Sequence, residues 1–149
     1  MRKTCRASTF IPAPVDQVFD VFTDYKTYRL LPGVKSTKIV QVGETEQSYS
    51  LGTIRELDLK FGIFHEQVTD VNYPHYWDYK FIKWPFSFTH IGGRMSFESV
   101  KDGTKMRWES TAEMKGIRSL ALPFIAWVSG YGLKVLSLQM KSIILKNTT

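Results

Sequence analysis

Seven short segments in which apolar and polar residues alternate dominate this sequence and limit the folds that it can adopt. Alternation with a period of two is typical of a β-strand with one buried face. We expect strands at Lys3–Ile11, Ser36–Val42, Ser48–Leu59, Ile63–Asn72, Tyr76–Trp84, Phe88–Val100 and Lys105–Met114. Short connections join the last six, and Asp102-Gly103 is the clearest signal for a tight hairpin turn. The pattern therefore predicts an antiparallel sheet of about seven strands.

Helical segments flank the strands. Pro12-Ala13-Pro14 ends the first strand, because proline cannot donate to a β-ladder but suits the first turn of a helix. Residues 15–22 then place valines and phenylalanines on one face of a short helix, and Tyr25–Leu31 predicts a second short helix. A longer helix follows from Ile117. We expect an α+β fold in a single domain of residues 1–149, since no linker divides the chain.

Centring the hairpins on their turns predicts which residues lie opposite one another. A turn at Lys60-Phe61 pairs Leu57 with Phe64 and Arg55 with Glu66, while one at Asp102-Gly103 pairs Phe97 with Trp108. One face of the sheet is then apolar, and the other is polar. We expect the apolar face to carry Leu51, Leu57, Phe64, Val68, Trp77, Tyr79, Phe81, Ile91, Met95, Phe97, Met106, Trp108 and Met114.

Arg55 and Glu66 break this pattern, because both fall on the apolar face and opposite one another. An unpaired buried charge is costly, so the pairing is informative. The residues alone leave two interpretations open. The pair is either a buried salt bridge that only fixes the register, or a polar anchor that orients a carboxylate, carbonyl or hydroxyl group of a ligand.

The last helix is expected to cover the apolar face. Apolar residues recur there at spacings of three and four, a pattern typical of a buried helical stripe. The stripe consists of Leu120, Phe124, Trp127, Tyr131, Val135, Leu138 and Leu145. The uncharged stretch Ser119–Leu133 is shorter than the ~20 residues that cross a bilayer. Pro123, Gly130 and Gly132 weaken its helix and favour a movable lid, with a plain core helix as the alternative.

The order of elements and several local motifs resemble the START-like, polyketide cyclase/dehydrase and lipid-transport superfamily. The resemblance is carried by IPAPVDQVFDVFTDYKTYRLLPGV (Ile11–Val34), by Gly52–Arg55, by Glu66–Val71 and by Asp102–Trp108. It implies a helix-grip fold, in which a curved antiparallel sheet wraps around a long C-terminal helix and two short helices follow the first strand. It also implies a cavity for lipids, sterols or polyketides, without supplying a catalytic set.

We expect the chain to bind, and to carry or sequester, a small hydrophobic ligand in a cavity between the sheet and the C-terminal helix. Aromatic side chains supply contact area and a few polar groups fix orientation. The expected ligand-binding residues are Arg55, Glu66, Trp77, Tyr79, Phe81, Phe97, Trp108, Ser110, Phe124, Trp127 and Tyr131, with Thr53 as a further polar contact. Ordinary core packing remains the alternative for each aromatic residue.

A polyketide cyclase/dehydratase-type enzyme that uses the same cavity is the alternative function. Glu66 would act as general base if burial made its carboxylate more basic, and Tyr79 would donate a proton. Arg55 beside Glu66 argues the other way, because a nearby cation keeps a carboxylate ionised. The register places His65 and His90 on the outer face, so neither histidine joins a catalytic set.

The net charge of +6 is uneven, because no acidic residue follows Glu113. A basic region can attract nucleic acid or anionic lipid. The lysines are widely spaced, so we expect a solvated helix edge and no nucleic-acid partner. A transient membrane contact through Leu122–Ile125 is a weaker option, and the oligomeric state stays open.

The remaining features point to no cofactor and no metal. Cys5 is the only cysteine and the three histidines are scattered, so ligand spacing for a metal site is absent from the sequence. One cysteine allows no internal disulfide, and the first residues contain no apolar run of the kind found in signal peptides. We therefore expect a cytoplasmic protein.

Overall fold

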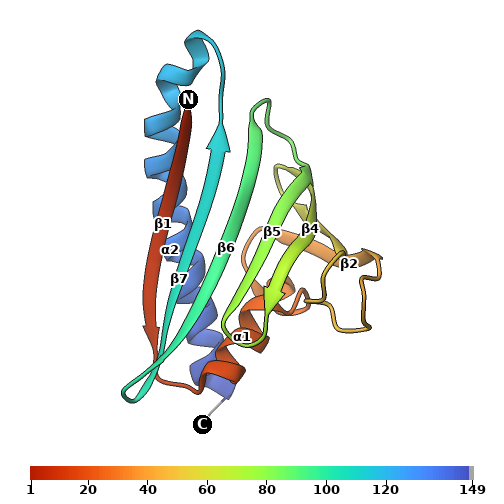
Figure 1. Ribbon diagram of the computed structural model, residues 1–149, viewed down its shortest axis with the longest axis vertical. Coiled ribbons are helices and arrows are strands. Elements are labelled where there is room, and N and C mark those ends of the chain that lie inside the picture. The colour runs from red at the N-terminus through yellow and green to blue at the C-terminus, as the bar shows by residue number, and fades with distance from the viewer. Residues whose placement is uncertain (148–149) are drawn as a thin grey trace.

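Seven antiparallel strands form one sheet in the computed structural model, which describes residues 1–147 (Figure 1). The strands are β1 (Arg2–Ile11), β2 (Val34–Gln41), β3 (Ile54–Leu59), β4 (Gly62–Asn72), β5 (Tyr76–Lys83), β6 (Thr89–Val100) and β7 (Gly103–Glu113). Their order in the sheet is β1-β7-β6-β5-β4-β3-β2. The predicted α+β fold with a curved seven-stranded sheet is confirmed.

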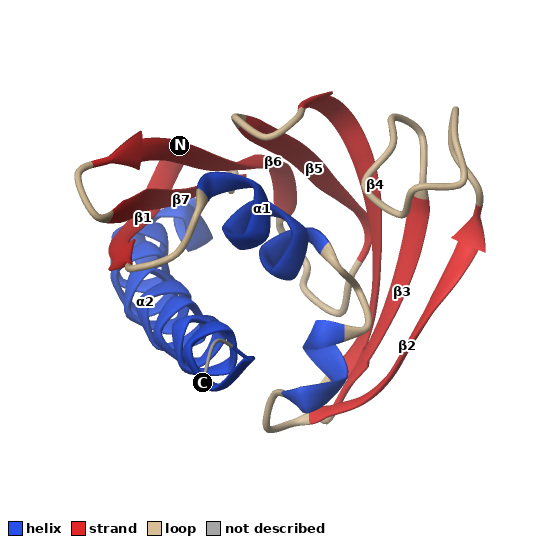
Figure 2. Cartoon of the chain, turned by 90° about the horizontal axis from the view of Figure 1, so that it is seen from below, coloured by secondary structure: helices blue, strands red, loops and turns tan. Residues whose placement is uncertain are grey.

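Two short helices and one long helix lie on one side of this sheet (Figure 2). They are α1 (Val15–Thr23), the 3₁₀ helix η1 (Thr27–Leu30) and α2 (Leu122–Asn147), which the 3₁₀ helix η2 (Ile117–Ala121) precedes. α1 packs on β6 and η1 packs on β2, whereas α2 packs mainly along β1 at the opposite edge of the sheet. The two short helices after the first strand and the long final helix are confirmed.

The third expected strand begins later than predicted, at Ile54 in place of Ser48. Ser50 explains the difference, because its hydroxyl donates to the Thr45 carbonyl and contacts the Thr53 hydroxyl. Gly52 has a φ of 87°, which an extended strand does not allow. The segment is thus a loop, and Leu51 is exposed in it, contrary to its predicted place on the apolar face.

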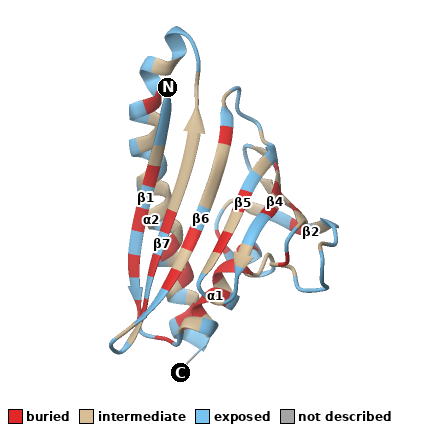
Figure 3. Ribbon diagram, viewed as in Figure 1, coloured by how far each residue is buried: buried red, intermediate tan, exposed pale blue. Residues whose placement is uncertain are grey.

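The core lies between the sheet and α1, where Phe19 and Phe22 are fully buried (Figure 3). Phe19 contacts Phe97 edge to face at 5.2 Å between centroids, and Phe22 contacts Trp108 at 6.5 Å. Edge-to-face aromatic pairs contribute about 0.5–1.5 kcal/mol beyond the burial of their area. Predicted inward residues of β4 to β7, such as Phe97, are therefore part of the core.

The predicted register is correct for β3 and β4 and wrong by two residues for β6 and β7. Leu57 lies opposite Phe64, as expected, but Phe97 lies opposite Met106 and not Trp108. The hairpin turns at Lys101-Asp102, because Asp102 adopts a φ of 66° and leaves Gly103 to pair with Val100. An even shift keeps every side chain on its face, so the predicted division between faces survives.

His90 is buried on the apolar face, so its predicted outward position is wrong. The ladder between β6 and β7 contains an irregularity between His90 and Gly92, where one residue has no partner. An extra residue of this kind reverses the alternation beyond it. This irregularity accounts for the inward position of His90.

The face of α2 that meets the sheet differs from the predicted one. Phe124, Trp127 and Tyr131 are 66%, 73% and 73% exposed, and the other members of the predicted stripe are also exposed. The buried residues of α2 are Leu122, Ser137, Met140 and Ile144. α2 carries apolar residues on every side, so its spacing alone did not identify the inner face. Gly130 faces β1, where an added β-carbon would make an ordinary contact of 3.4 Å with the Arg6 carbonyl oxygen.

Two of the three residues that favoured a lid have other roles. Pro123 occupies the first turn of α2, where its missing N–H removes no helical hydrogen bond. Gly130 lies on the face of α2 that packs against β1. Leu122 is buried, so the predicted membrane contact through this side chain is also wrong.

Candidate functional site

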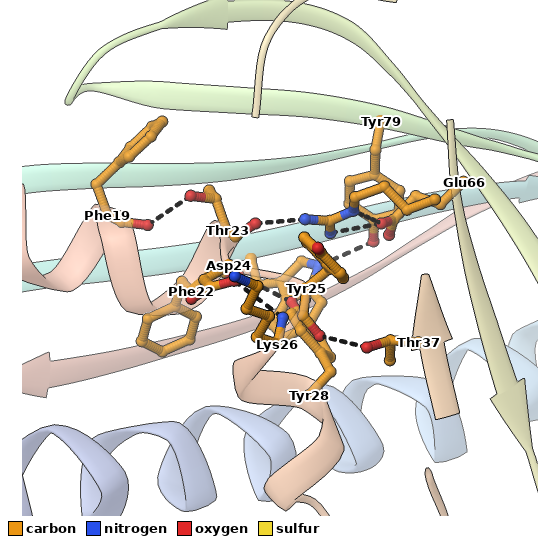
Figure 4. Close-up of polar contacts among 12 residues, drawn as sticks. Phe19, Phe22, Thr23, Asp24, Tyr25, Lys26, Tyr28, Thr37, Glu66 and Tyr79 are labelled. Atoms are coloured by element: carbon orange, nitrogen blue, oxygen red, sulfur yellow. Dashed lines mark hydrogen bonds and ion pairs between the residues drawn. The ribbon is translucent and has the colours of Figure 1, made fainter. Parts of the chain in front are cut away.

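Arg55 and Glu66 form a buried ion pair on the apolar face, at opposed positions of β3 and β4 (Figure 4). Arg55 Nε and Nη2 donate to the same oxygen, Glu66 Oε1, at 2.9 and 2.6 Å. Neither bond uses Oε2. Arg55 is fully buried and Glu66 is 4% exposed, so the charges compensate one another in an environment that screens them little.

The remaining guanidinium nitrogen of Arg55 binds the C-terminal end of α1. This atom, Nη1, donates to the backbone carbonyl of Thr23, the last residue of α1. A cation at the carbonyl end of a helix is favourable, because the helix dipole is negative there. The guanidinium group also lies 4.6 Å from the Trp77 ring centroid and 5.8 Å from that of Tyr28. All of these contacts of Arg55 are with the protein, which supports the register-fixing interpretation for the arginine.

Two polar atoms near Arg55 stay outside these hydrogen bonds. Glu66 Oε2 takes no part in the two arginine bonds. The indole N–H of Trp77 is buried and has no acceptor among residues 1–147. A buried donor without an acceptor destabilises a fold by about 1–3 kcal/mol. A ligand oxygen at this position would remove that penalty.

A second polar network surrounds Tyr79. Trp108 Nε1 donates to the Tyr79 hydroxyl at 2.9 Å. His90 Nδ1 accepts from the Phe81 N–H at 3.0 Å, so Nε2 carries the ring proton and donates to Ser110 Oγ at 2.9 Å. Burial, reinforced by the charge of Lys80, lowers the pKa of His90 to about 4, and the ring is neutral at pH 7. Burial also raises the pKa of Tyr79 well above its usual range.

A continuous row of aromatic rings joins the ion pair to the surface. Trp77 contacts Tyr79, Tyr79 contacts Phe81, Phe81 contacts Phe64, and Phe64 contacts Phe61, with centroids 5.1–5.8 Å apart. Trp77 is fully buried, whereas Phe61 is 64% exposed. We call these five residues the aromatic row. Its inner members are buried and packed against one another, and its outer end, Phe61, reaches solvent.

Three further aromatic residues, which are not among the predicted site residues, extend the aromatic row outward. Trp84 stacks on Phe81 at 5.6 Å, and Phe86 and Phe88 contact Trp84 from the loop between β5 and β6. The signal was present in WPFSF (Trp84–Phe88), a loop richer in aromatic residues than a turn requires.

The structure divides the predicted ligand-binding residues into two groups. Arg55, Glu66, Trp77, Tyr79, Phe81, Phe97, Trp108 and Ser110 lie together on the inner face of the sheet. Phe124, Trp127 and Tyr131 point outward from α2, so their predicted inward orientation is wrong. Thr53 is buried at the start of β3, where its hydroxyl contacts Ser50.

Two clefts, each with a volume of about 540 Å³, lie outside this inner face. The first lies between α1, β2 and the loop before β3, where Asp20, Glu46 and Tyr49 contribute to a mainly polar lining. The second lies between β1 and α2, with Cys5, Gly130 and Trp127 among its residues. Neither matches the predicted cavity over the aromatic residues of the sheet.

The geometry gives weak support to acid–base chemistry. Two donors of Arg55 bind the same oxygen of Glu66, so that oxygen is already engaged within the protein. His90 donates to Ser110 and so cannot withdraw its proton in this tautomer. Within residues 1–147, histidine, cysteine and carboxylate side chains form no cluster suited to a metal ion. The arrangement is suited to binding an apolar molecule with a few polar contacts.

Comparison with known proteins agrees with this geometry. The model of a family described as polyketide cyclase / dehydrase and lipid transport matches residues 2–136. No curated protein matches the sequence.

Similar solved structures share the fold at low sequence identity. A START superfamily protein from Mycobacterium smegmatis has a TM-score of 0.78 and 14% identity, over 96% of this chain and 97% of that one. The Zhui aromatase/cyclase from Streptomyces has a TM-score of 0.75 and 11% identity, over 100% and 97%. Truncated norcoclaurine synthase from Thalictrum flavum has a TM-score of 0.72 and 14% identity, over 97% and 94%. Identities this low establish the helix-grip fold alone.

Proposed function

Because the chain belongs to the polyketide cyclase/dehydrase and lipid transport family, we propose that it binds a small hydrophobic ligand on the inner face of its sheet, along the aromatic row. The supporting observation is the unbroken contact of rings from exposed Phe61 to buried Trp77. Aromatic side chains give large contact area at little cost in conformational entropy.

The ion pair supplies the polar end of this site. Glu66 Oε2 accepts a hydrogen bond from a ligand hydroxyl, and the indole N–H of Trp77 donates to a ligand oxygen. Arg55 holds Glu66 in place, with Nε and Nη2 directed to Glu66 and Nη1 to Thr23. An apolar molecule with one oxygen-bearing end fits this distribution best.

We propose that the protein carries or sequesters this ligand in the cytoplasm, where its single thiol, Cys5, stays reduced. A carrier of an apolar molecule must exchange it with another apolar phase. A transient contact with a membrane is the partner that we propose for this exchange.

Native mass spectrometry of the protein as purified tests the binding. We expect a second mass above that of the apoprotein, which organic extraction removes. Phe81→Ala should reduce the occupied fraction, because it interrupts the aromatic row. Ile82→Ala is the matched control, since the adjacent side chain on the same strand is exposed and outside the row. Equal occupancy in the two variants, or an empty wild-type protein that binds no anilinonaphthalene sulfonate, would contradict the proposal.

A polyketide cyclase/dehydratase-type enzyme on the same face is the second candidate. The hydroxyls of Tyr79 and Ser110 favour it, because both belong to a buried network that could place a proton donor beside a substrate carbonyl. Incubation with linear poly-β-ketone analogues and product analysis by mass spectrometry separates the two functions. Turnover that Tyr79→Phe abolishes would support the enzyme, whereas binding without turnover supports the carrier.

A further inference from the structure

The outer face of α2 exposes an unusual amount of apolar surface. Its exposed apolar residues share one side of the helix, and we call them the outward stripe. The stripe comprises Leu120 of η2 and, on α2, Phe124, Trp127, Val128, Tyr131, Val135, Leu138 and Leu145. Contiguous exposed apolar patches of this kind mark interaction sites on soluble proteins. The protein accordingly has an apolar surface separate from the inner face of the sheet.

The charges beside this stripe all have one sign. No acidic residue occurs from Lys115 to Asn147, whereas the same segment contains Arg118, Lys134, Lys141 and Lys146. Lys134 donates to the Ser8 carbonyl and the Thr9 hydroxyl, which are neutral acceptors and leave its charge uncompensated. The surface combines exposed apolar side chains with cations alone, which complements an anionic and partly apolar partner.

We propose that the outward stripe docks α2 on the surface of a bilayer that contains anionic lipid, with the helix axis parallel to the membrane plane. Trp127 and Tyr131 lie in the middle of the stripe, and these residue types prefer the boundary between headgroups and acyl chains. The cleft between β1 and α2 adjoins them, and Lys3 in its lining adds a further cation, whereas Arg6 is paired with Glu109. The inference rests on the proposed function only in that the membrane is where the ligand is exchanged.

The packing of α2 excludes a helix that spans the bilayer. By length and hydropathy Ile117–Asn147 would suffice to cross one, and only 6% of its most apolar window is buried. Met140 and Ile144 belong to the core, however, and Gly130 lies against the Arg6 backbone. A spanning helix would have to leave these contacts, whereas a docked helix keeps them.

Charge disfavours a second copy of the chain as the partner. Two outward stripes in contact would bring the cations of both helices together, without an acidic side chain on either helix to neutralise them. Lys134 and Lys141 flank the apolar residues, so like charges would meet at the rim of such an interface. Anionic lipid headgroups neutralise the same cations.

Co-sedimentation of the full chain with vesicles tests the docking. We expect binding to vesicles of equal parts phosphatidylcholine and phosphatidylglycerol, little binding to phosphatidylcholine alone, and weakening at high salt. Trp127→Ala combined with Tyr131→Ala should lower the partition coefficient roughly tenfold. Arg118→Gln and Lys141→Gln should each lower it about fivefold.

Lys80→Gln combined with Ile82→Ala is the matched control, because both side chains are exposed on β5, away from α2. Each vesicle sample is also titrated with anilinonaphthalene sulfonate, which reports the inner face. Lost vesicle binding with unchanged dye binding in the Trp127/Tyr131 variant supports the docking surface. Equal vesicle binding in wild type and this variant overturns it, as does equal binding to neutral and anionic vesicles. A dimer in light scattering that the same variant dissociates, without vesicle binding, also overturns it.

Discussion

Replacing Arg55 by leucine should destabilise the protein by roughly 3–5 kcal/mol, because it leaves the Glu66 carboxylate buried without its partner. The same change removes the donor to the Thr23 carbonyl and the cation–π contact with Trp77. In a Glu66→Gln background Arg55→Leu leaves no buried charge without a partner. There it should lower the free energy of unfolding by only about 1–3 kcal/mol. The structure thus predicts a coupling of about 2 kcal/mol between the two positions.

Urea unfolding of the wild type, the two single variants and the double variant measures this coupling at pH 7. A far-UV circular dichroism signal reports the sheet and α1 together. Additivity within about 0.5 kcal/mol would refute a buried, mutually compensating ion pair. A loss below about 1 kcal/mol for Arg55→Leu alone would refute the burial itself.

The same four proteins separate the structural role of the pair from its role in binding. We expect Arg55→Leu in the Glu66→Gln background to lower the affinity for an apolar ligand more than it lowers stability, because the side chain at position 66 then loses the donors that fix it beside the aromatic row. Parallel losses in ligand affinity and stability would support a purely structural pair.

Three further predictions test other parts of the structure. His90 is buried with a pKa of about 4, against an ordinary value of 6.5, so only the unfolded chain gains a proton as the pH falls from 6.5. The free energy of unfolding should be at its full value above pH 6.5 and about 3 kcal/mol lower at pH 4. In urea titrations, His90→Gln should remove most of this pH dependence. Gly93→Ala should destabilise by roughly 1–3 kcal/mol, since its β-carbon would lie 2.2 Å from Tyr79 Cζ; an unchanged melting temperature would contradict this contact. Met140→Ala should lower the free energy of unfolding by about 2–5 kcal/mol, and Leu138→Ala should lower it by less than about 0.5 kcal/mol. The reverse order would mean that α2 packs on the sheet through its opposite face.

The sheet was predictable because its signals are local. The turn after β3 and the alternation on both sides of it are enough to place Arg55 opposite Glu66, and the structure has that pair. The β6–β7 hairpin shows the limit of this reasoning. Its turn shifts by one residue because Asp102 adopts a positive φ, which the Asp102-Gly103 pattern assigns equally to the glycine.

The orientation of α2 and the position of His90 depend on long-range packing. The sequence of α2 has apolar residues on every side of the helix, so their spacing is compatible with several buried faces, and the packing of Met140 and Ile144 into the core selects one of them. The bulge before Gly92 turns His90 inward, although alternation along β6 predicts the opposite face. The site was therefore predictable where it follows strand pairing, and not where it depends on a bulge or on the contact between helix and sheet.

The most direct test of ligand binding along the aromatic row is to locate a bound apolar molecule by nuclear magnetic resonance. Intermolecular Overhauser effects to assigned aromatic side chains would give its position. We expect the extracted ligand to contact Phe64, Phe81 and Tyr79, and the oxygen-bearing end of the ligand to lie near Glu66. Contacts confined to Trp127 and Tyr131 on α2, with none to the inner face of the sheet, would contradict it.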